Sequence, residues 1–319
     1  MAYTESPQQQ LVESQPMGLS TFEALKTARS DSMIIPSEEQ RAQLQAILLQ
    51  ILDDVHAYCE HEHLTYLLSG GNVLGALRHQ GFIPWDDDAD LFMPRRDYLR
   101  FIDGFSEAYP GKYWLESPEH TPEVGIPIAR IRREGTVARL YNDKAGEHMG
   151  VGVDIFVLED VPDQPLLRTL HGIRCLLAGL FFSCRRFARD ADYYRQLAAD
   201  NPSLRRTTNI KIALGRLASV RPLEWWSGHI ARVYSHYQLP NSTYISCPSG
   251  RLHYFGELFR REDFLPPAQA SFEGRQLNIP RHPEVYLERL YGNWQEPPAP
   301  DKRELHGYEE LDLGEEGLE

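Results

Sequence analysis

Cysteines are few in this chain, positive charge is not in excess and long hydrophobic runs are missing. Each shortage excludes a class of protein. The four cysteines among 319 residues form no C-x-x-C pair and show no zinc-ligand spacing, so we expect reduced, buried thiols. The formal net charge of −13 argues against a nucleic-acid binder with a broad basic surface. A local basic pocket for one nucleotide stays compatible with that charge.

The hydrophobic runs are too short for a bilayer-spanning helix. The longest, CLLAGLFFSC at residues 175–184, reaches about half of the length that a span needs. The first residues, MAYTESPQQQ, lack the basic and apolar regions of a secretory signal. We therefore expect a soluble cytoplasmic protein, or at most a peripheral one at the inner face of the membrane.

Composition and periodicity divide the chain into four parts. Residues 1–35 are polar and predict a flexible lead with one short helix near 21–26. Residues 36–160 alternate between helical and strand patterns and predict a compact core. Residues 161–306 predict a helical, arginine-rich and then irregular part packed on that core, and residues 307–319 an acidic tail.

The core region predicts a mixed α/β (α+β) fold. Its first helix begins after Ser37, an N-cap residue with Gln40 as its capping-box partner. A short helix closed by Gly81 and a longer one after Pro94 follow. Strand patterns are found at 64–71, 88–94, 112–117, 126–136 and 150–162. Strands interleaved with helices predict a mixed sheet flanked by helices.

The segment LLSGGNVLGALRHQGFIPWDDDADLFMPR, residues 67–95, carries the chemistry. In a strand, side chains two apart share a face, so Asp86, Asp88 and Asp90 would project together. Like charges this close need a counter-charge. A divalent cation is the natural one, and Mg²⁺ or Mn²⁺ prefers carboxylate oxygens.

Two other interpretations of the aspartates were weighed. Most acidic runs are solvated turns, although such turns rarely lead at once into an apolar strand. A calcium-binding loop needs Gly at its sixth position and Glu at its twelfth, where this chain has Leu91 and Asp97. We therefore exclude the calcium loop.

A later aspartate and a glycine pair extend the candidate site. Asp154 is isolated in the apolar stretch GVGVDIFVLE, where a buried carboxylate must be paired, metal-bound or hydrogen-bonded to backbone N–H groups. A strand beside the first would bring it to the same cation. Gly70 and Gly71 precede a helix, and such a turn exposes amides that can hold phosphate.

The combination resembles the LicD family, which includes the fukutin-related proteins. The similarity lies in GGNVLGALRHQGFIPWDDDADLFMPRRDY, in the downstream VDIFVLEDVP, and in the C-terminal FEGRQLNIPRHPEVYLERLYGNWQEPP and DKRELHG. It covers residues 38–306, with weak support between 164 and 240. Asn72 and Ala89 depart mildly from the family pattern, and His79 and His306 match family positions.

This resemblance implies a nucleotidyltransferase-like fold and a metal-dependent phosphotransferase. The expected reaction moves a phosphoryl-alcohol unit, with phosphocholine favoured, from a CDP-activated donor such as CDP-choline. The acceptor would be a hydroxyl of a glycan or lipid-linked glycan, such as lipopolysaccharide or teichoic acid, and CMP would leave. Mg²⁺ or Mn²⁺ would be the cofactor.

The resemblance also assigns roles to residues. Asp88 and Asp90 would bind the metal and act in catalysis, with Asp86 as a third ligand or as a group close behind the ligands. Asp154 would be a ligand of a second metal or the general base for the acceptor. Donor phosphates would be held by Gly70, Gly71, Asn72 and Arg78. Arg130 and Arg132 share a strand face and suit either phosphate binding or a surface salt-bridge set. The aromatic candidates for stacking the base or enclosing choline are Trp85, Tyr291 and Trp294, with core packing as the alternative.

Other functions and one further segment stay open. A nucleotidyltransferase that leaves AMP or CMP on its acceptor would keep the same fold, and a non-catalytic nucleotide-binding scaffold is a third hypothesis. The basic, amphipathic residues 166–195 suit contact with an anionic membrane or a cover over the acceptor groove. A core helix with a solvated arginine edge is the interpretation that we prefer for this segment.

Overall fold

The computed structural model describes residues 33–140, 146, 148–199, 201–299, 303 and 306–314. The predicted lead, with its short helix at 21–26, therefore lies almost entirely outside the described residues. The predicted acidic tail differs from the structure at its start, because Tyr308–Asp312 forms strand β11 and pairs antiparallel with β5 (Val137–Leu140). Ile34 bridges to Tyr308, so both ends of the described chain meet there.

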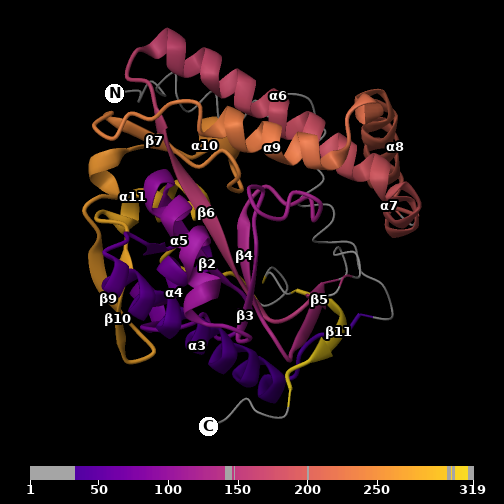
Figure 1. The fold of residues 1–319 in the computed structure, drawn as a ribbon. Helices are drawn as coiled ribbons and strands as arrows, with labels where there is room; N and C mark the ends of the chain where they lie inside the picture. The colour runs from indigo at the N-terminus through magenta and orange to yellow at the C-terminus, as the bar shows by residue number, and fades with distance from the viewer. Residues whose placement is uncertain are drawn as a thin grey trace, which may run out of the picture.

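The expected mixed sheet flanked by helices is confirmed (Figure 1). Its central strands follow the order β1-β2-β6-β4-β3, and the pair β2–β6 is parallel while the others are antiparallel. β7 pairs antiparallel with the C-terminal end of β6, and β8 pairs antiparallel with β7. The strands are β1 (Leu67–Leu68), β2 (Ala89–Pro94), β3 (Tyr113–Glu116), β4 (Ala129–Arg133), β6 (Gly152–Val161), β7 (Tyr244–Ser246) and β8 (Leu258–Arg260).

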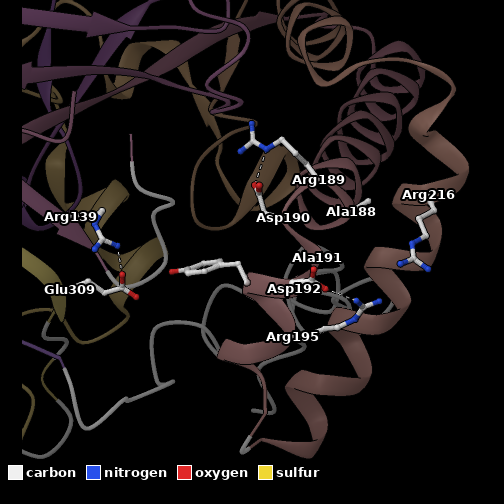
Figure 2. Close-up of a pocket in the computed structure, with 10 residues that line it drawn as sticks. Arg139, Ala188, Arg189, Asp190, Ala191, Asp192, Arg195, Arg216 and Glu309 are labelled. Atoms are coloured by element: carbon white, nitrogen blue, oxygen red, sulfur yellow. Dashed lines mark hydrogen bonds and ion pairs between the residues drawn. The ribbon is translucent and has the colours of Figure 1, made fainter. Parts of the chain in front are cut away.

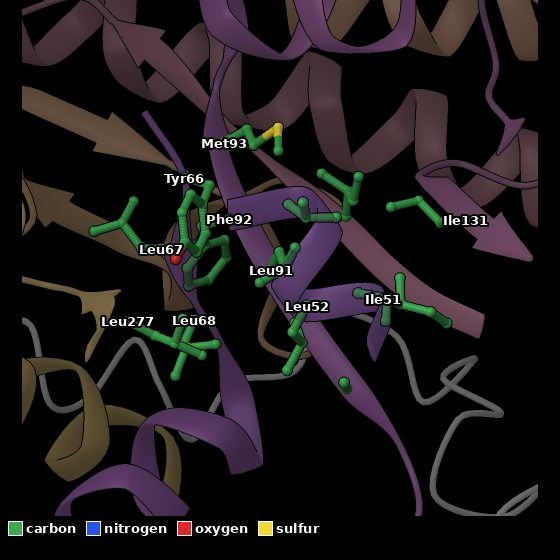
Figure 3. Close-up of a cluster of buried hydrophobic side chains, with 14 of the residues drawn as sticks. Ile51, Leu52, Tyr66, Leu67, Leu68, Leu91, Phe92, Met93, Ile131 and Leu277 are labelled. Carbon is green, nitrogen blue, oxygen red and sulfur yellow. The ribbon is translucent and has the colours of Figure 1, made fainter. Parts of the chain in front are cut away.

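Helices α3 (Glu38–Glu62) and α5 (Arg95–Ala108) pack against one side of this sheet. The capping box of α3 is confirmed, since Ser37 Oγ accepts from the Gln40 amide at 3.2 Å and the Gln40 side chain accepts from the Ser37 amide at 3.0 Å. Figure 3 shows Ile51 and Leu52 of α3 within the same buried cluster as Leu91 of β2. The regularly spaced apolar residues of α3 thus pack against the strand that carries the aspartate motif.

The opposite side of β2 meets the C-terminal half of the chain. Phe92 lies edge-on to Tyr286, with 5.5 Å between ring centroids, and to Phe264 and Phe156 at 5.9 and 6.3 Å. Tyr286 belongs to α11 (Pro283–Tyr291). The remaining elements here are α4 (Gly70–His79), α10 (His253–Gly256), β9 (Ala268–Phe272) and β10 (Arg275–Ile279). Asp90 shares the strand side of Phe92, so the candidate site faces these elements.

Four helices form a separate layer across one end of the sheet (Figure 1). They are α6 (Pro165–Arg189), α7 (Ala191–Leu197), α8 (Pro202–Leu217) and α9 (Leu223–Tyr234). Two small apolar clusters hold this layer together, and both are separate from the main core. The expected helical, arginine-rich region is therefore confirmed. All four cysteines are free and buried, as expected.

Candidate active site

Three charged residues form a row across three neighbouring strands. Asp90 of β2 lies in register with Asp154 of the parallel strand β6, and Asp154 lies in register with Arg130 of β4. Adjacent strands are about 4.8 Å apart, so all three side chains emerge within about 10 Å of one another. The prediction that the strand of Asp154 neighbours that of Asp90 is confirmed.

Arg130 is the immediate partner of Asp154. Its Nε and Nη2 atoms contact the two carboxylate oxygens, the latter at 2.8 Å, and both side chains are largely shielded from solvent. A two-point contact of this kind fixes the plane of the carboxylate. Arg130 therefore forms an ion pair with a carboxylate of the site, and the sequence had left both a salt bridge and phosphate binding open for this residue.

The three motif aspartates converge, although they are not residues of one strand. Because β2 begins at Ala89, the residues Asp86, Asp87 and Asp88 lie in the preceding loop, and strand alternation places only Asp90. Asp86 and Asp88 nevertheless lie within hydrogen-bonding contact. Burial, and next the charge of Asp88, raises the pKa of Asp86 well above its usual value. Asp86 therefore holds its proton to a higher pH than a solvent-exposed aspartate does.

Asp87 turns away from this group and contacts the C-terminal segment. It is buried, and its Oδ1 lies 2.7 Å from Nδ1 of His306. The other ring nitrogen of His306 lies 3.7 Å from Oδ2 of Asp88. The hydroxyl of Tyr308 donates to the carbonyl of Asp87 at 3.4 Å. Residues more than two hundred positions downstream therefore hold the aspartate loop in place.

The glycine pair allows the backbone to approach two carboxylates. A Cβ at Gly70 would lie 3.0 Å from Oδ2 of Asp90, and a Cβ at Gly71 would lie 2.5 Å from Oδ2 of Asp86. Gly70 also has a φ of +52°, in the left-handed region that favours glycine. Side chains at these positions would displace the carboxylates of the site.

Two backbone amides of the predicted phosphate-binding turn already donate hydrogen bonds within the protein. Gly70 N–H donates to the Tyr286 hydroxyl at 2.9 Å, and Asn72 N–H donates to the Ser69 carbonyl at 3.0 Å. The Asn72 side chain is buried, and its Oδ1 accepts from the Asp90 amide at 2.6 Å. The role that the structure gives Asn72 is therefore to position Asp90. A phosphate role for these amides stays a prediction.

Two of the predicted phosphate-binding arginines lie elsewhere. Arg132 is buried, donates to the Gly150 carbonyl at 3.1 Å and has its Nε 3.7 Å from Glu116, so it forms a buried ion pair and not the surface salt bridge that the sequence offered as the alternative. Arg78 stands in the last turn of α4. The helix rise carries it about 12 Å along the axis from Gly70. Arg78 donates to the Trp294 carbonyl at 3.0 Å.

Trp85 is enclosed by the protein's own cations. The guanidinium of Arg303 lies 4.0 Å from its ring centroid, and that of Arg78 lies 6.0 Å away. The aromatic face that could have stacked a base or choline is thus in contact with Arg303. The Nε of Arg303 is buried and has no hydrogen-bond partner among the described residues.

Tyr291 contributes its hydroxyl to the site. Burial raises its pKa, and the charges of Asp86 and Asp90 raise it further, while Arg251 lowers it. Arg251 belongs to the loop after β7, and its charge also reaches the buried Glu257. Tyr286 and Arg251 were missed by the sequence analysis. Neither belongs to a motif, and only the packing of α11 and of the loop after β7 brings them near the aspartates.

The carboxylates of the candidate site were also compared with the arrangement that a bound metal ion requires. No group of three or more His, Cys, Asp or Glu side chains in the described part of the chain is arranged to hold a metal ion. Asp154, predicted as a ligand, is engaged by Arg130. The carboxylates of Asp86, Asp88 and Asp90 still fit a hard cation, because they supply the oxygen donors that Mg²⁺ and Mn²⁺ prefer.

A surface hollow lies outside this group. It measures about 600 Å³, and residues of β5, β11 and helices α6 to α8 line it (Figure 2). Its arginines face acids, since Arg139 pairs with Glu309, and Arg189 contacts Asp190 at 2.8 Å. None of the predicted site residues lines it. We therefore do not include it in the candidate active site.

Comparisons with known proteins show one family-model match and several similar proteins. Residues 63–164 match the model of the family described as LicD/FKTN/FKRP, nucleotidyltransferase domain. The chain is 27% identical over 271 residues to the lipopolysaccharide cholinephosphotransferase LicD of Haemophilus influenzae. This alignment covers 82% of this chain and 94% of that protein.

Two further similarities are local. An uncharacterised protein of Rickettsia typhi is 39% identical over 54 residues, which is 17% of this chain and 18% of that protein. One of Rickettsia prowazekii is 40% identical over 52 residues, or 16% of this chain and 20% of that protein.

Proposed function

We propose that this chain is a transferase that moves phosphocholine onto lipopolysaccharide, because residues 63–164 match the LicD/FKTN/FKRP nucleotidyltransferase domain and most of the chain aligns with a lipopolysaccharide cholinephosphotransferase. The name and extent of the Haemophilus relative support the transferred group and the acceptor. The finer parts of the proposal are CDP-choline as donor, Mg²⁺ or Mn²⁺ as cofactor and CMP as leaving group. The observation that carries it is the row of Asp90, Asp154 and Arg130 beside the aspartate loop.

The proposed reaction is a substitution at phosphorus. A hydroxyl oxygen of the acceptor forms a bond to the phosphorus of the phosphocholine unit, and the bond from that phosphorus to the bridging oxygen of CMP breaks. CMP departs with the bonding electrons, and the acceptor proton passes to a carboxylate. Such reactions depend on positioning and charge stabilisation more than on covalent catalysis.

Asp154 is the proposed acceptor of the proton. Its carboxylate stands next to Asp90 and is oriented by two nitrogens of Arg130. Each carboxylate oxygen keeps a further lone pair for a substrate hydroxyl. Arg130 is thus a positioning residue in this proposal.

Asp86, Asp88 and Asp90 are the proposed ligands of the divalent cation. When bound, the cation would neutralise charge at the donor diphosphate. Gly70 and Gly71 keep the backbone close to the carboxylates of Asp90 and Asp86, and Asn72 also fixes Asp90 by accepting from its amide. Arg303, with its buried Nε and its contact with Trp85, is the proposed partner of a donor phosphate in place of Arg132. A cytoplasmic location is part of the proposal and is supported by the four free cysteines.

The experiment combines CDP-choline labelled in the choline group, lipopolysaccharide from a strain that lacks choline, and Mg²⁺. Formation of CMP and of labelled lipopolysaccharide is followed together. We expect both products to appear, both to stop on chelation, and Asp90→Asn to lower the rate at least about 100-fold. Asp103→Asn is the matched control, because Asp103 is exposed on α5 and belongs to a surface ion pair.

The outcomes separate the candidate functions. Label in lipopolysaccharide with CMP release supports the proposal. Nucleotide retained on an acceptor, from CTP or ATP, would instead indicate a nucleotidyltransferase. Binding of CDP-choline without any product would indicate a scaffold, and equal rates for Asp90→Asn and Asp103→Asn would refute the assigned site.

A further inference from the structure

Helix α6 carries an apolar stripe that the protein does not cover. Its members are between 40 and 64% exposed and follow one another at intervals of three or four residues, which places them on one side of the helix. They are Leu166, Leu170, Ile173, Leu177 and Phe181. The stripe runs about 22 Å along the helix. An exposed apolar strip of this length is typical of a docking surface.

The stripe continues onto α9 through Trp226. The rings of Phe181 and Trp226 stack with 5.9 Å between centroids. A hollow of about 250 Å³ opens between the two helices, with Leu177, Phe181 and Trp226 among its apolar lining and with Arg174 and His229 as its basic members. We call the stripe together with Trp226 the α6–α9 face. It combines apolar side chains, a Trp and basic groups, as surfaces at a membrane interface do.

The charge of this layer is opposite to that of the whole chain. Residues 165–235 contain twelve Lys and Arg and four Asp and Glu, a net charge of +8, while the chain carries −13. Helix α6 itself contains five arginines and no acid. Anionic lipid headgroups attract basic surfaces by about 1 kcal/mol per residue near the membrane. The layer is therefore complementary to an anionic leaflet.

Helix α6 has the length and composition of a membrane span, and among the described residues it is the one helix that does. Only 28% of its 18-residue apolar stretch is buried inside the protein, whereas a core helix would be mostly buried. This corrects our preferred interpretation of the segment as a core helix. Its other side nevertheless packs within the protein, with Cys175 and Phe182 in a buried cluster of the layer. Spanning the bilayer would break that packing, so the helix suits a position parallel to the membrane plane.

We infer that the α6–α9 face docks on an anionic membrane, with α6 lying in the headgroup region and its apolar stripe toward the acyl chains. This inference rests on the surface itself and not on the donor or the chemistry of the active site. It complements the proposed function, because a membrane-docked enzyme would meet an amphiphilic acceptor at the bilayer surface.

The test is co-flotation of the full chain with lipid vesicles. One set contains phosphatidylcholine alone, and the other contains phosphatidylglycerol as well. We expect binding to the anionic set that weakens as salt is raised. Leu177→Glu should lower the bound fraction about tenfold or more, because it places a charge in the stripe. Leu99→Glu is the matched control, since Leu99 is 39% exposed on α5, away from this layer.

Two further variants separate loss of membrane binding from loss of folding and from errors in the active-site assignment. Leu166→Glu, at the most exposed position of the stripe, is a second variant in case Leu177→Glu disturbs folding, which the melting temperature reports. Asp90→Asn should bind vesicles like the unchanged protein, so a wrong active-site assignment and a wrong docking surface give different results.

Three outcomes would overturn the inference. The first is no co-flotation with anionic vesicles, and the second is equal loss of binding in Leu99→Glu. The third is a dimer in solution that Leu177→Glu dissociates, which would assign the face to a second copy of the chain.

Discussion

Asp90 and Asp154 lie directly opposite each other on the parallel strands β2 and β6, although 64 positions separate them in the chain. Hydrogen bonds of the ladder hold the two strands in this register, so the two carboxylates keep a fixed spacing. Arg130 completes the row from β4 and balances one of the two charges. The catalytic proposal depends on this fixed arrangement of the three side chains.

Gly70→Ala should lower transfer activity about tenfold or more while costing about 1 kcal/mol of folding stability. The added methyl group would press on Asp90 Oδ2, and the positive φ would strain any residue with a Cβ. The measurement is kcat/KM together with urea unfolding. Gly111→Ala is the matched control, because Gly111 has a φ of +74° and open space around its Cβ position. Comparable activity losses in the two variants would show that strain, and not the contact with Asp90, matters.

Arg130 and Asp154 should behave as one unit. Arg130→Ala leaves a shielded carboxylate without its partner, and Asp154→Asn leaves a shielded guanidinium in the same position, so each should lower stability by about 1–3 kcal/mol. The double variant should cost clearly less than the sum of the two. A double-mutant cycle by urea unfolding measures this coupling, which we expect to be about 1 kcal/mol or more. Additive losses would contradict the pairing that the structure gives.

Glu257→Gln should stabilise the protein above neutral pH. Burial raises the pKa of Glu257 from 4.5 to about 7. Between these values the unfolded chain releases a proton that the folded chain keeps, so stability falls as pH rises through this window and then levels off. Removing the ionisable group should therefore raise the unfolding free energy at pH 8 by up to about 3 kcal/mol and change it little near pH 4.5.

Melting temperatures across this pH range measure the effect. The exposed Glu107→Gln on α5 serves as the control and should shift the curve equally little at every pH. A gain from Glu257→Gln that is the same at pH 4.5 and pH 8 would show that the carboxyl group titrates normally in the folded protein.

The sequence predicted the secondary structure of the core well where one strong local signal operates. The apolar period of α3, the capping box at Ser37 and the apolar strand ending at Pro94 all depend on residues close in the chain. The sequence was less accurate where backbone geometry varies within a few residues. It applied strand alternation to Asp86 and Asp88, which lie in the loop before β2, and it closed α4 at Gly81, whereas the left-handed cap is Gln80.

By itself, the sequence determined that Asp90 and Asp154 each lie in an apolar strand segment and that a glycine pair precedes the first of them. It also determined that an amphipathic basic helix follows. Only the tertiary structure decided which groups these residues meet. Gly70 N–H meets the hydroxyl of Tyr286, 216 positions away, and Asp87 meets His306, 219 positions away. Such contacts arise from the packing of α11 and of the C-terminal segment, which no local period encodes. The same holds for α6, because its composition allows a buried or an exposed apolar side and only its packing against α8 and α9 leaves the stripe open.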